Sequence, residues 1–238
     1  MSVLLEVIAT TVADARLAAQ AGADRLELVT AMGEGGLTPS IGLMEAVVDT
    51  VSIPVNVIVR PHSRSFVYDA DDFAVMLRDV QAVKAAGANG VVIGMLNANS
   101  EIDRQQLARA IDAAGDLAIT FHRAFDEARD QQKALDVLLG FDAVTNVLTS
   151  GGKPSVLDAE ATIRELARQA AGSRCTVLAG AGLTVDAVAG FVSRTRVEAV
   201  HFGSGVRTGG NGLAPVESEK VAQVRALLDA EAKSWRAG

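Results

Sequence analysis

The sequence is poor in cysteine and proline, and it lacks long apolar runs. Cys175 is the one cysteine among 238 residues, so no disulfide can form within the chain, as is usual in the cytosol. Five prolines and 22 glycines without a short period exclude collagen-like and low-complexity chains. No stretch of about 18 apolar residues is free of charge, so no segment is predicted to span a bilayer. The residues from Met1 to Glu6 lack the features of a signal peptide, and we expect a cytoplasmic protein.

Positive charge is also scarce. Lysine and arginine total 22 against 29 aspartate and glutamate residues, which gives a net charge of −7. This sign opposes binding to nucleic-acid phosphates or to an anionic membrane, and neither partner is expected. The chain is 49% apolar and 21% charged, a composition that allows a large folded core.

Short runs rich in β-branched residues alternate with segments of helical periodicity, such as Asp72 to Leu77. Strands that are joined through helices pair in parallel, because a parallel connection must cross over. Eight such units match an α/β fold of the closed (β/α)₈ TIM-barrel type, for which about 250 residues is typical, and we predict a single domain over 1–238. A doubly wound open sheet is the alternative, but no Gly-rich fingerprint follows the first run. The predicted strands are Leu4–Ala9, Arg25–Val29, Val55–Arg60, Gly90–Met95, Leu117–His122, Val144–Thr149, Thr176–Gly180 and Ala199–Gly203.

Residues that begin and end helices support this division. Gly22 and Gly87 stand where a helix is expected to end in a left-handed turn before the next strand. Thr38 before Pro39 is predicted to cap a helix, and Thr184 is expected to do the same further along.

In a barrel, the carboxyl ends of the strands carry the chemistry. All three histidines and several arginines fall there, which makes the mouth of this acidic chain locally cationic and predicts a small anionic or polar ligand. Ordinary solvated loop residues are the alternative interpretation. These residues are His62, His122, His201, Arg60, Arg64, Arg123 and Arg207.

Two glutamates lie inside predicted strands. Alternation in Leu4–Ala9 turns Leu5, Val7 and Ala9 toward the helices and Glu6 toward the barrel axis, and Glu27 faces inward in the same way. Buried carboxylates need cationic partners, and the candidates are Arg60, His122 and Arg123. A structural ion-pair layer is one interpretation. The other is a pair of carboxylates that works with His122 as acid and base.

Glycine-rich segments follow three consecutive predicted strands: Thr149–Gly152 (TSGG), Gly180–Gly182 (GAG) and Gly203–Gly205 (GSG). Loops after the seventh and eighth strands of many barrels bind phosphate through backbone N–H groups. Tight turns also require glycine, so each segment has a structural explanation as well. The predicted anion-binding residues are Ser150, Gly151, Gly180, Gly182, Gly203 and Ser204.

Motifs for other chemistries are absent from the sequence. There is no Gly-x-Ser-x-Gly elbow, and Cys175 precedes a strand at the end of the barrel opposite the mouth. No Cys-x-x-Cys, His-Glu-x-x-His or EF-hand spacing occurs, so the residues alone identify no metal site.

Several motifs together resemble the CutC family of copper homeostasis proteins. They are LEVIA with Glu6, GADRLEL with Glu27, EGGLTPS (34–40), VIVRP with Arg60, TFHRAFD (120–126), VLTSGG (147–152), AGAGL (179–183) and VHFGSG (200–205). The resemblance covers nearly the whole chain and implies a barrel fold, a cytoplasmic location and a link to copper, with no reaction firmly attached.

The link to copper that the resemblance implies would require soft ligands in this chain, because Cu(I) prefers thiolates and thioethers. Family members associated with copper binding carry cysteines near the first two strands, where this sequence has Ile8, Ala9 and Val29. Of its methionines, Met32 and Met95 are expected near the mouth.

The candidate site residues that match the family pattern are Glu6, Glu27, Arg60, His122, Arg123 and His201. Two functions therefore stand side by side. One is copper binding within copper homeostasis; the other is an enzyme that uses acid–base chemistry on a sugar-like or phosphorylated small molecule. A homodimer is also expected, since acidic barrels with alanine-rich outer helices often pair.

Overall fold

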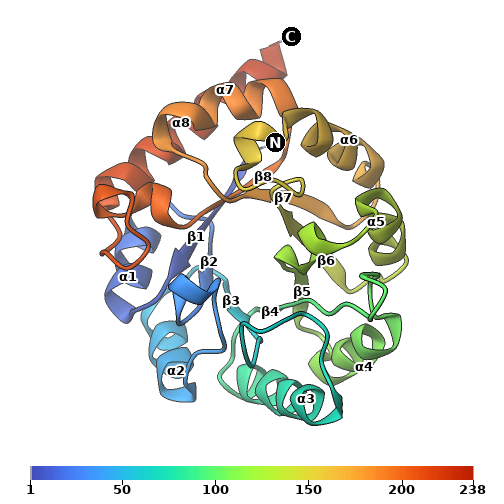
Figure 1. Cartoon of the computed structure of the whole chain (residues 1–238). Coiled ribbons are helices and arrows are strands. Elements are labelled where there is room, and N and C mark those ends of the chain that lie inside the picture. Colours follow the sequence, from blue (N-terminus) through green and yellow to red (C-terminus); the bar gives the residue numbers. More distant parts are fainter. Residues whose placement is uncertain (1, 238) are drawn as a thin grey trace.

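The computed structural model describes residues 2–237, and its centre is a closed barrel of eight parallel strands. The strands follow one another around the barrel in chain order, and β8 closes it by pairing with β1 (Figure 1). The predicted (β/α)₈ TIM barrel is thereby confirmed, and every strand lies within its predicted range. The strands are β1 (Leu4–Ala9), β2 (Arg25–Leu28), β3 (Val55–Ile58), β4 (Gly90–Ile93), β5 (Ala118–Phe121), β6 (Val144–Thr149), β7 (Thr176–Gly180) and β8 (Ala199–Phe202).

Eight α-helices of the described residues surround the barrel (Figure 1). Each turns an apolar face inward; α3, for example, buries Phe73, Met76 and Val80. None of the helices within 2–237 combines the length and apolarity needed to cross a membrane. The helices are α1 (Val12–Gln20), α2 (Ile41–Thr50), α3 (Ala70–Ala85), α4 (Arg104–Ala114), α5 (Gln131–Leu139), α6 (Glu160–Ala170), α7 (Val185–Thr195) and α8 (Ser218–Ala237).

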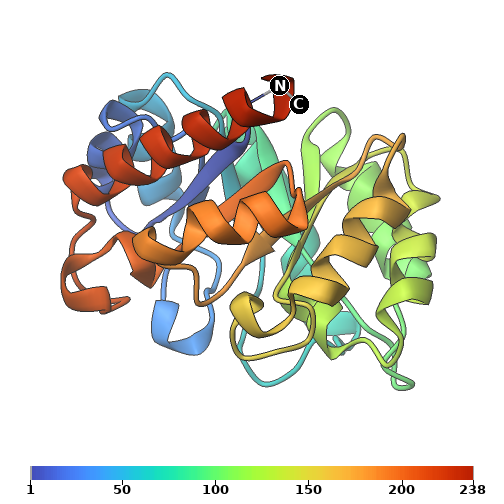
Figure 2. The same ribbon diagram turned by 90° about the horizontal axis from the view of Figure 1, so that it is seen from above.

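Short 3₁₀ segments occupy the loops at the carboxyl ends of the strands. Figure 2 shows two of them, η1 (Met32–Glu34) and η3 (Val156–Asp158), at the edge of the barrel opposite the start of β1. The others are η2 (Arg123–Glu127), η4 (Ser204–Val206) and η5 (Thr208–Gly210). These loops surround the mouth.

The alternation of side chains in β1 is as predicted. Leu5, Val7 and Ala9 have no exposed surface and belong to the main core between barrel and helices, whereas Glu6 faces the barrel interior. Small apolar clusters fill part of that interior, one of them formed by Val29, Ile58 and Val92. The remaining inward positions include the buried charged residues Glu6, Arg25 and Glu27. Buried charges are stable only when an opposite charge lies beside them.

Helix ends agree with the sequence at most positions. Gly22 and Gly87 have φ values of 99° and 75°, in the left-handed region that favours glycine. The predicted cap at Thr38 is wrong: α2 begins at Ile41, and the Ser40 hydroxyl accepts the hydrogen bond from the Leu43 N–H. Thr38 instead accepts from the Arg60 backbone N–H at 2.9 Å, so it joins the loop after β2 to the end of β3.

Thr184 caps α7, since its hydroxyl accepts a hydrogen bond from the Ala187 N–H. We expect Thr184→Ala to lower the free energy of unfolding by about 1 kcal/mol, because one N–H of the first turn loses its acceptor. Urea denaturation measures this change. Thr184→Ser keeps the hydroxyl and serves as the control; an equal loss in both variants would exclude the cap as the cause.

Candidate functional site

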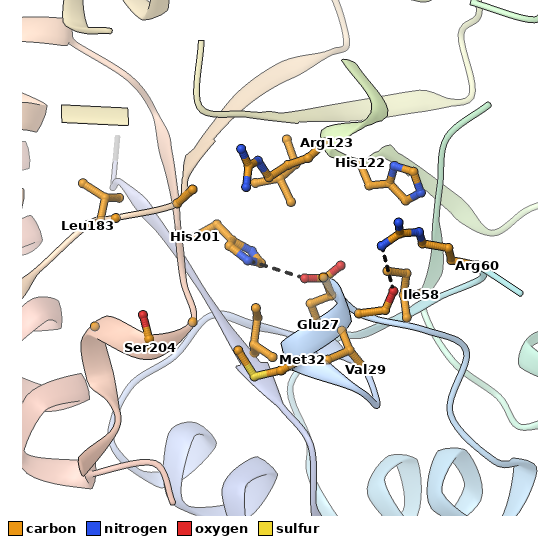
Figure 3. A pocket seen from close by; sticks show the side chains of 18 of the residues that line it. Glu27, Val29, Met32, Ile58, Arg60, His122, Arg123, Leu183, His201 and Ser204 are labelled. Atoms are coloured by element: carbon orange, nitrogen blue, oxygen red, sulfur yellow. Dashed lines mark hydrogen bonds and ion pairs between the residues drawn. The ribbon is translucent and has the colours of Figure 1, made fainter. Parts of the chain in front are cut away.

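A cavity of about 200 Å³ opens at the carboxyl ends of the strands. Its lining includes Glu27, Arg60, His122, Arg123, His201 and Ser204 (Figure 3). Gly182 and Gly203 line it as well, and the sequence placed all eight residues at the site. Side chains of Ile8, Val29, Ile58 and Leu148 form apolar parts of its wall. The other predicted residues, Glu6, Ser150, Gly151 and Gly180, do not line it.

A cluster of four charged side chains lies at the cavity floor and extends below it; its members are Glu6, Arg25, Glu27 and His201. His201 stands between the two glutamates: its Nδ1 is 2.8 Å from Glu6 Oε1 and its Nε2 is 3.5 Å from Glu27 Oε2. Arg25 Nε donates to Glu6 Oε2 at 2.5 Å, and Arg25 Nη1 reaches across the barrel to Asn146 Oδ1 at 2.9 Å. The expectation that Arg60, His122 or Arg123 pairs with these carboxylates is therefore wrong. Arg25 was missed, although strand alternation places it on the same face as Glu27.

The two glutamates differ in protonation. Burial raises the pKa of Glu6, but Arg25 and His201 outweigh burial, so this pKa lies below its ordinary value. Burial also raises the pKa of Glu27, and the nearby Glu6 charge adds to it; His201 only partly offsets them, and the pKa rises to about 7. Glu27 therefore exchanges its proton near neutral pH while Glu6 stays ionised.

His201 is the second basic side chain of this cluster, beside Arg25. Burial lowers its pKa, but the hydrogen bond to Glu6 and the charges of both glutamates raise it above the ordinary value. Its ring thus links Glu6, whose pKa is lowered, to Glu27, whose pKa is raised to about 7.

His122 is a neutral histidine. The Ala124 N–H donates to its Nδ1 at 3.1 Å, so the proton of the neutral ring is on Nε2. Burial, together with the Arg60 charge, lowers the pKa of His122 to about 3. Gly94 packs directly against the His122 ring. A Cβ at position 94 would lie 2.4 Å from Nδ1, so a larger residue there would collide with the ring. His122 is accordingly suited to donate a hydrogen bond and unsuited to accept a proton at neutral pH, which leaves Glu27 as the better proton carrier.

This description of His122 predicts a spectrum. In protein labelled with ¹⁵N-histidine, we expect the His122 ring to keep the neutral Nε2–H pattern from about pH 5 to pH 8, because its pKa is about 3. Loss of the signal in His122→Gln assigns it. A His122 signal that titrates near the ordinary histidine pKa would contradict the buried hydrogen bond from Ala124.

Arg60 is held by the EGGL segment. Its Nη1 donates to the carbonyl oxygens of Glu34 and Gly36, at 3.1 and 3.3 Å. Gly35 and Gly36 present these carbonyls from a turn in which both have positive φ, 83° and 90°. The turn formed by residues 34–37 thus positions the Arg60 guanidinium in the cavity wall.

Arg123 and the TSGG loop are tied together by Asp126. Asp126 accepts hydrogen bonds from Arg123 Nε at 2.7 Å and from the N–H groups of Ser150 and Gly152, while the Gly151 N–H donates to Thr149 Oγ1. The prediction that Ser150 and Gly151 bind an anion is not supported by this placement, because their N–H groups already have acceptors inside the protein.

The two later glycine loops are placed differently. Gly182, Gly203 and Ser204 line the cavity, whereas Gly180 lies beside His201, where a Cβ would be 3.1 Å from the His201 Cβ. Gly182 has a φ of 77°, and a Cβ there would meet the Ser155 hydroxyl at 2.4 Å. These glycines are explained by close packing and turn geometry.

Three other residues assigned to the mouth lie outside the cavity. His62 Nε2 is 2.9 Å from Asp72, and Arg64 also approaches that carboxylate. Arg207 is fully buried and donates to Asp14 at 3.1 Å, so it joins the loop after β8 to α1. These contacts are structural.

Ligand atoms for a metal ion come together at one place among the residues described. Glu6, Glu27 and His201 each offer an atom within 4.8 Å of the others. These are hard or borderline donors, and Arg25 already neutralises Glu6. Soft donors are few: Met32 lines the cavity, Met95 is buried in the main core rather than at the mouth, and burial raises the pKa of the distant Cys175 thiol to about 12. This donor set does not fit Cu(I).

Fold and cavity together define a (β/α)₈ barrel with a cavity at the carboxyl ends of its strands. A model of the CutC family matches residues 3–206. The chain belongs to the CutC family.

Individual relatives also bear the name of the CutC family. The chain is 41% identical over 190 residues to a family protein CutC of Mesorhizobium japonicum, covering 79% of this chain and 73% of the relative. It is 40% identical over 232 residues to one of Caulobacter vibrioides, covering 93% of both. The crystal structure of CutC from Streptococcus agalactiae, which is named for copper homeostasis, superposes with a TM-score of 0.78 at 26% identity, over 84% of this chain and 97% of that one. A phosphoribosylanthranilate isomerase of Pyrococcus furiosus shares the fold alone, with a TM-score of 0.61 at 13% identity over 96% of this chain and 99% of the isomerase.

Proposed function

We propose that this CutC-family protein is an enzyme that transfers a proton to or from a small polar metabolite bound at the barrel mouth. The observation that carries this proposal is Glu27, a buried carboxyl at the cavity floor whose pKa of about 7 suits it to proton transfer at neutral pH. His201 contacts Glu27 and is held from its other side by Glu6. An arginine of the wall, Arg60 or Arg123, holds the anionic group of the ligand.

The size of the cavity limits the substrate. A volume of about 200 Å³ lies below the roughly 300–1,000 Å³ of pockets for drug-sized ligands, which suits a short sugar derivative or organic acid. The wall combines charged groups with aliphatic side chains, as in many sites for small metabolites.

The test is conversion of a metabolite mixture in D₂O, followed by ¹H NMR. We expect one component to be converted or to exchange a carbon-bound proton, and Glu27→Gln to slow this about 10²- to 10⁴-fold, since it removes the proton carrier and keeps its shape. Glu160→Gln, on the outer surface, is the matched control. Conversion at the same rate in Glu27→Gln, or none in a mixture that contains a stabilising ligand, would reject the proposal.

Copper binding is the second candidate, favoured by the family's name and by the convergence of Glu6, Glu27 and His201. Carboxylate and imidazole ligands suit Cu(II) better than Cu(I). If this candidate holds, one equivalent of copper should bind in competition with a chelator, and Glu27→Gln should weaken the binding. The absence of binding above that of a histidine-free control protein would remove it.

We also propose a cytoplasmic location. The free, buried Cys175 supports it, because thiols stay reduced there. Recovery of the tagged chain in the periplasmic rather than the cytosolic fraction would overturn this assignment.

A further inference from the structure

Arg60 is a buried cation without an acidic partner among the residues described. Only 7% of its surface is exposed, and it takes part in no ion pair within 2–237. Its Nη1 is bound to two carbonyls and its guanidinium stacks over the Phe66 ring at 4.6 Å, whereas its Nε is buried with no acceptor. Arginine is rarely buried unless a negative charge compensates it.

The groups around Arg60 do not supply that charge. The Tyr68 hydroxyl lies near it, but burial raises the pKa of Tyr68 to about 12, so the phenol is neutral. His122 is neutral as well. The Glu34 carboxylate accepts from Ser63, and only its backbone carbonyl faces Arg60.

The remaining charges of the cavity are paired with one another. Arg123 binds Asp126, and Arg25 binds Glu6. His201 lies against Glu27. Arg60 is therefore a cation of the cavity wall that has no acidic partner among the residues described.

His122 and Phe66, two uncharged side chains of the same wall, lie next to Arg60. The Nε2–H of His122 is buried and has no acceptor among residues 2–237, and Phe66 packs on both the His122 ring and Arg60. In Figure 3 the guanidinium of Arg60 lies beside the His122 ring, on the same hollow as Glu27. Two buried donors without acceptors, next to a guanidinium without an acidic partner, make this part of the wall positive and favour a ligand with negative charge.

We infer that Arg60 forms the anion subsite of this cavity and that the ligand it takes is a small carboxylate. The inference gives the substrate class of the proposed function and depends on the same cavity being its site. A carboxylate brings a single negative charge and matches the single charge of Arg60. A phosphate monoester carries about −1.5 to −2 at neutral pH and would leave negative charge close to Glu27. Arg123 is the weaker candidate because Asp126 already binds it.

The experiment measures binding without turnover. Glycolate and lactate, and for comparison inorganic phosphate and methyl phosphate, are titrated into the protein at constant ionic strength set with sodium chloride. Heat release and the ¹⁵N signal of the His122 ring report binding. We expect the carboxylates to bind, to shift the His122 Nε2–H signal, and to bind about 10- to 100-fold more weakly to Arg60→Met, which loses charge-assisted hydrogen bonds.

Arg123→Met is the matched control, since it removes a second arginine from the same cavity. We expect Arg123→Met to change carboxylate affinity less than about threefold. Arg123 is already paired with Asp126, so the substitution mainly removes that internal ion pair and not a contact with the ligand. Arg60→Lys keeps the charge and should retain part of the binding.

Three outcomes would overturn the inference: tighter binding of the phosphates than of the carboxylates, an equal loss in Arg60→Met and Arg123→Met, or no carboxylate effect beyond that of the salt. The proposed function fails separately. Carboxylate binding through Arg60 with no Glu27-dependent conversion rejects the enzyme and leaves the subsite. Glu27-dependent conversion with an unchanged KM in Arg60→Met rejects the subsite alone.

Discussion

Replacing Arg25 by methionine is expected to lower the free energy of unfolding by about 3–5 kcal/mol at pH 7, because it leaves the ionised Glu6 buried without its strongest partner. Glu6 has no exposed surface, and Arg25 Nε lies 2.5 Å from its Oε2. The same substitution removes the hydrogen bond to Asn146 on the opposite side of the barrel. Urea denaturation at pH 7 measures the loss.

The double variant Glu6→Gln with Arg25→Met separates the unpaired charge from the loss of packing. If the charge is responsible, the double variant should recover most of the stability, because position 6 then carries no charge that needs a cation. Arg168→Met is a control at the surface, where Arg168 pairs with the exposed Glu165, and it should cost about 1 kcal/mol or less. A loss below about 1 kcal/mol in Arg25→Met would mean that water reaches Glu6.

The strands and the direction of their side chains could be predicted because both are local properties. β-Branched runs of the right length, ended by glycine, gave every strand, and the alternation in Leu4–Ala9 placed Glu6 inside the barrel. The same alternation applied to Arg25 and Glu27 would have placed a cation beside two carboxylates. That signal was present in the sequence.

The pairing of Arg60 could not be predicted in the same way. β3 neighbours β2, which suggested an ion pair between Arg60 and Glu27. The guanidinium turns instead to the carbonyls of Glu34 and Gly36, which the turn at Gly35 and Gly36 brings within reach. Side-chain direction beyond the end of a strand depends on loop conformation, and the pattern of residues in the strand does not specify it.

The glycine loops show a second limit. TSGG has the composition of an anion-binding loop, but Asp126, 24 residues before Ser150, takes the N–H groups of that loop. Whether a backbone N–H is free depends on long-range contacts such as this one. The sequence predicted which loops meet at the mouth, and the structure shows which of them already have internal acceptors.

Stability is expected to fall as the pH rises from about 5 to 8, and Glu27→Gln is expected to remove most of this fall. Burial, together with the charge of Glu6, raises the pKa of Glu27 from its ordinary 4.5 to about 7, so the folded protein holds this proton more tightly than the unfolded chain. A group of this kind stabilises the fold below its unfolded pKa, and the contribution is lost as the pH rises through its folded pKa. The shift corresponds to about 3 kcal/mol.

The other groups of the cluster do not reverse this slope. The raised pKa of His201 acts in the same direction, because its contribution is also lost as the pH rises through the folded pKa. The lowered pKa of Glu6 gives a contribution that is lost only below its unfolded pKa of 4.5, outside this range.

Urea denaturation at several pH values tests this account. Glu27→Gln should match the parent protein near pH 5, where glutamine resembles the protonated acid, and exceed it by about 2–3 kcal/mol near pH 8. Glu160→Gln changes a glutamate whose pKa is lowered by Arg194 and should leave the slope as it is. If Glu27→Gln were less stable than the parent at pH 8, Glu27 would be a structural partner of His201. A gain in stability would instead mean that the ionised Glu27 weakens the barrel that holds it, as expected of a side chain whose role lies in the chemistry of the cavity.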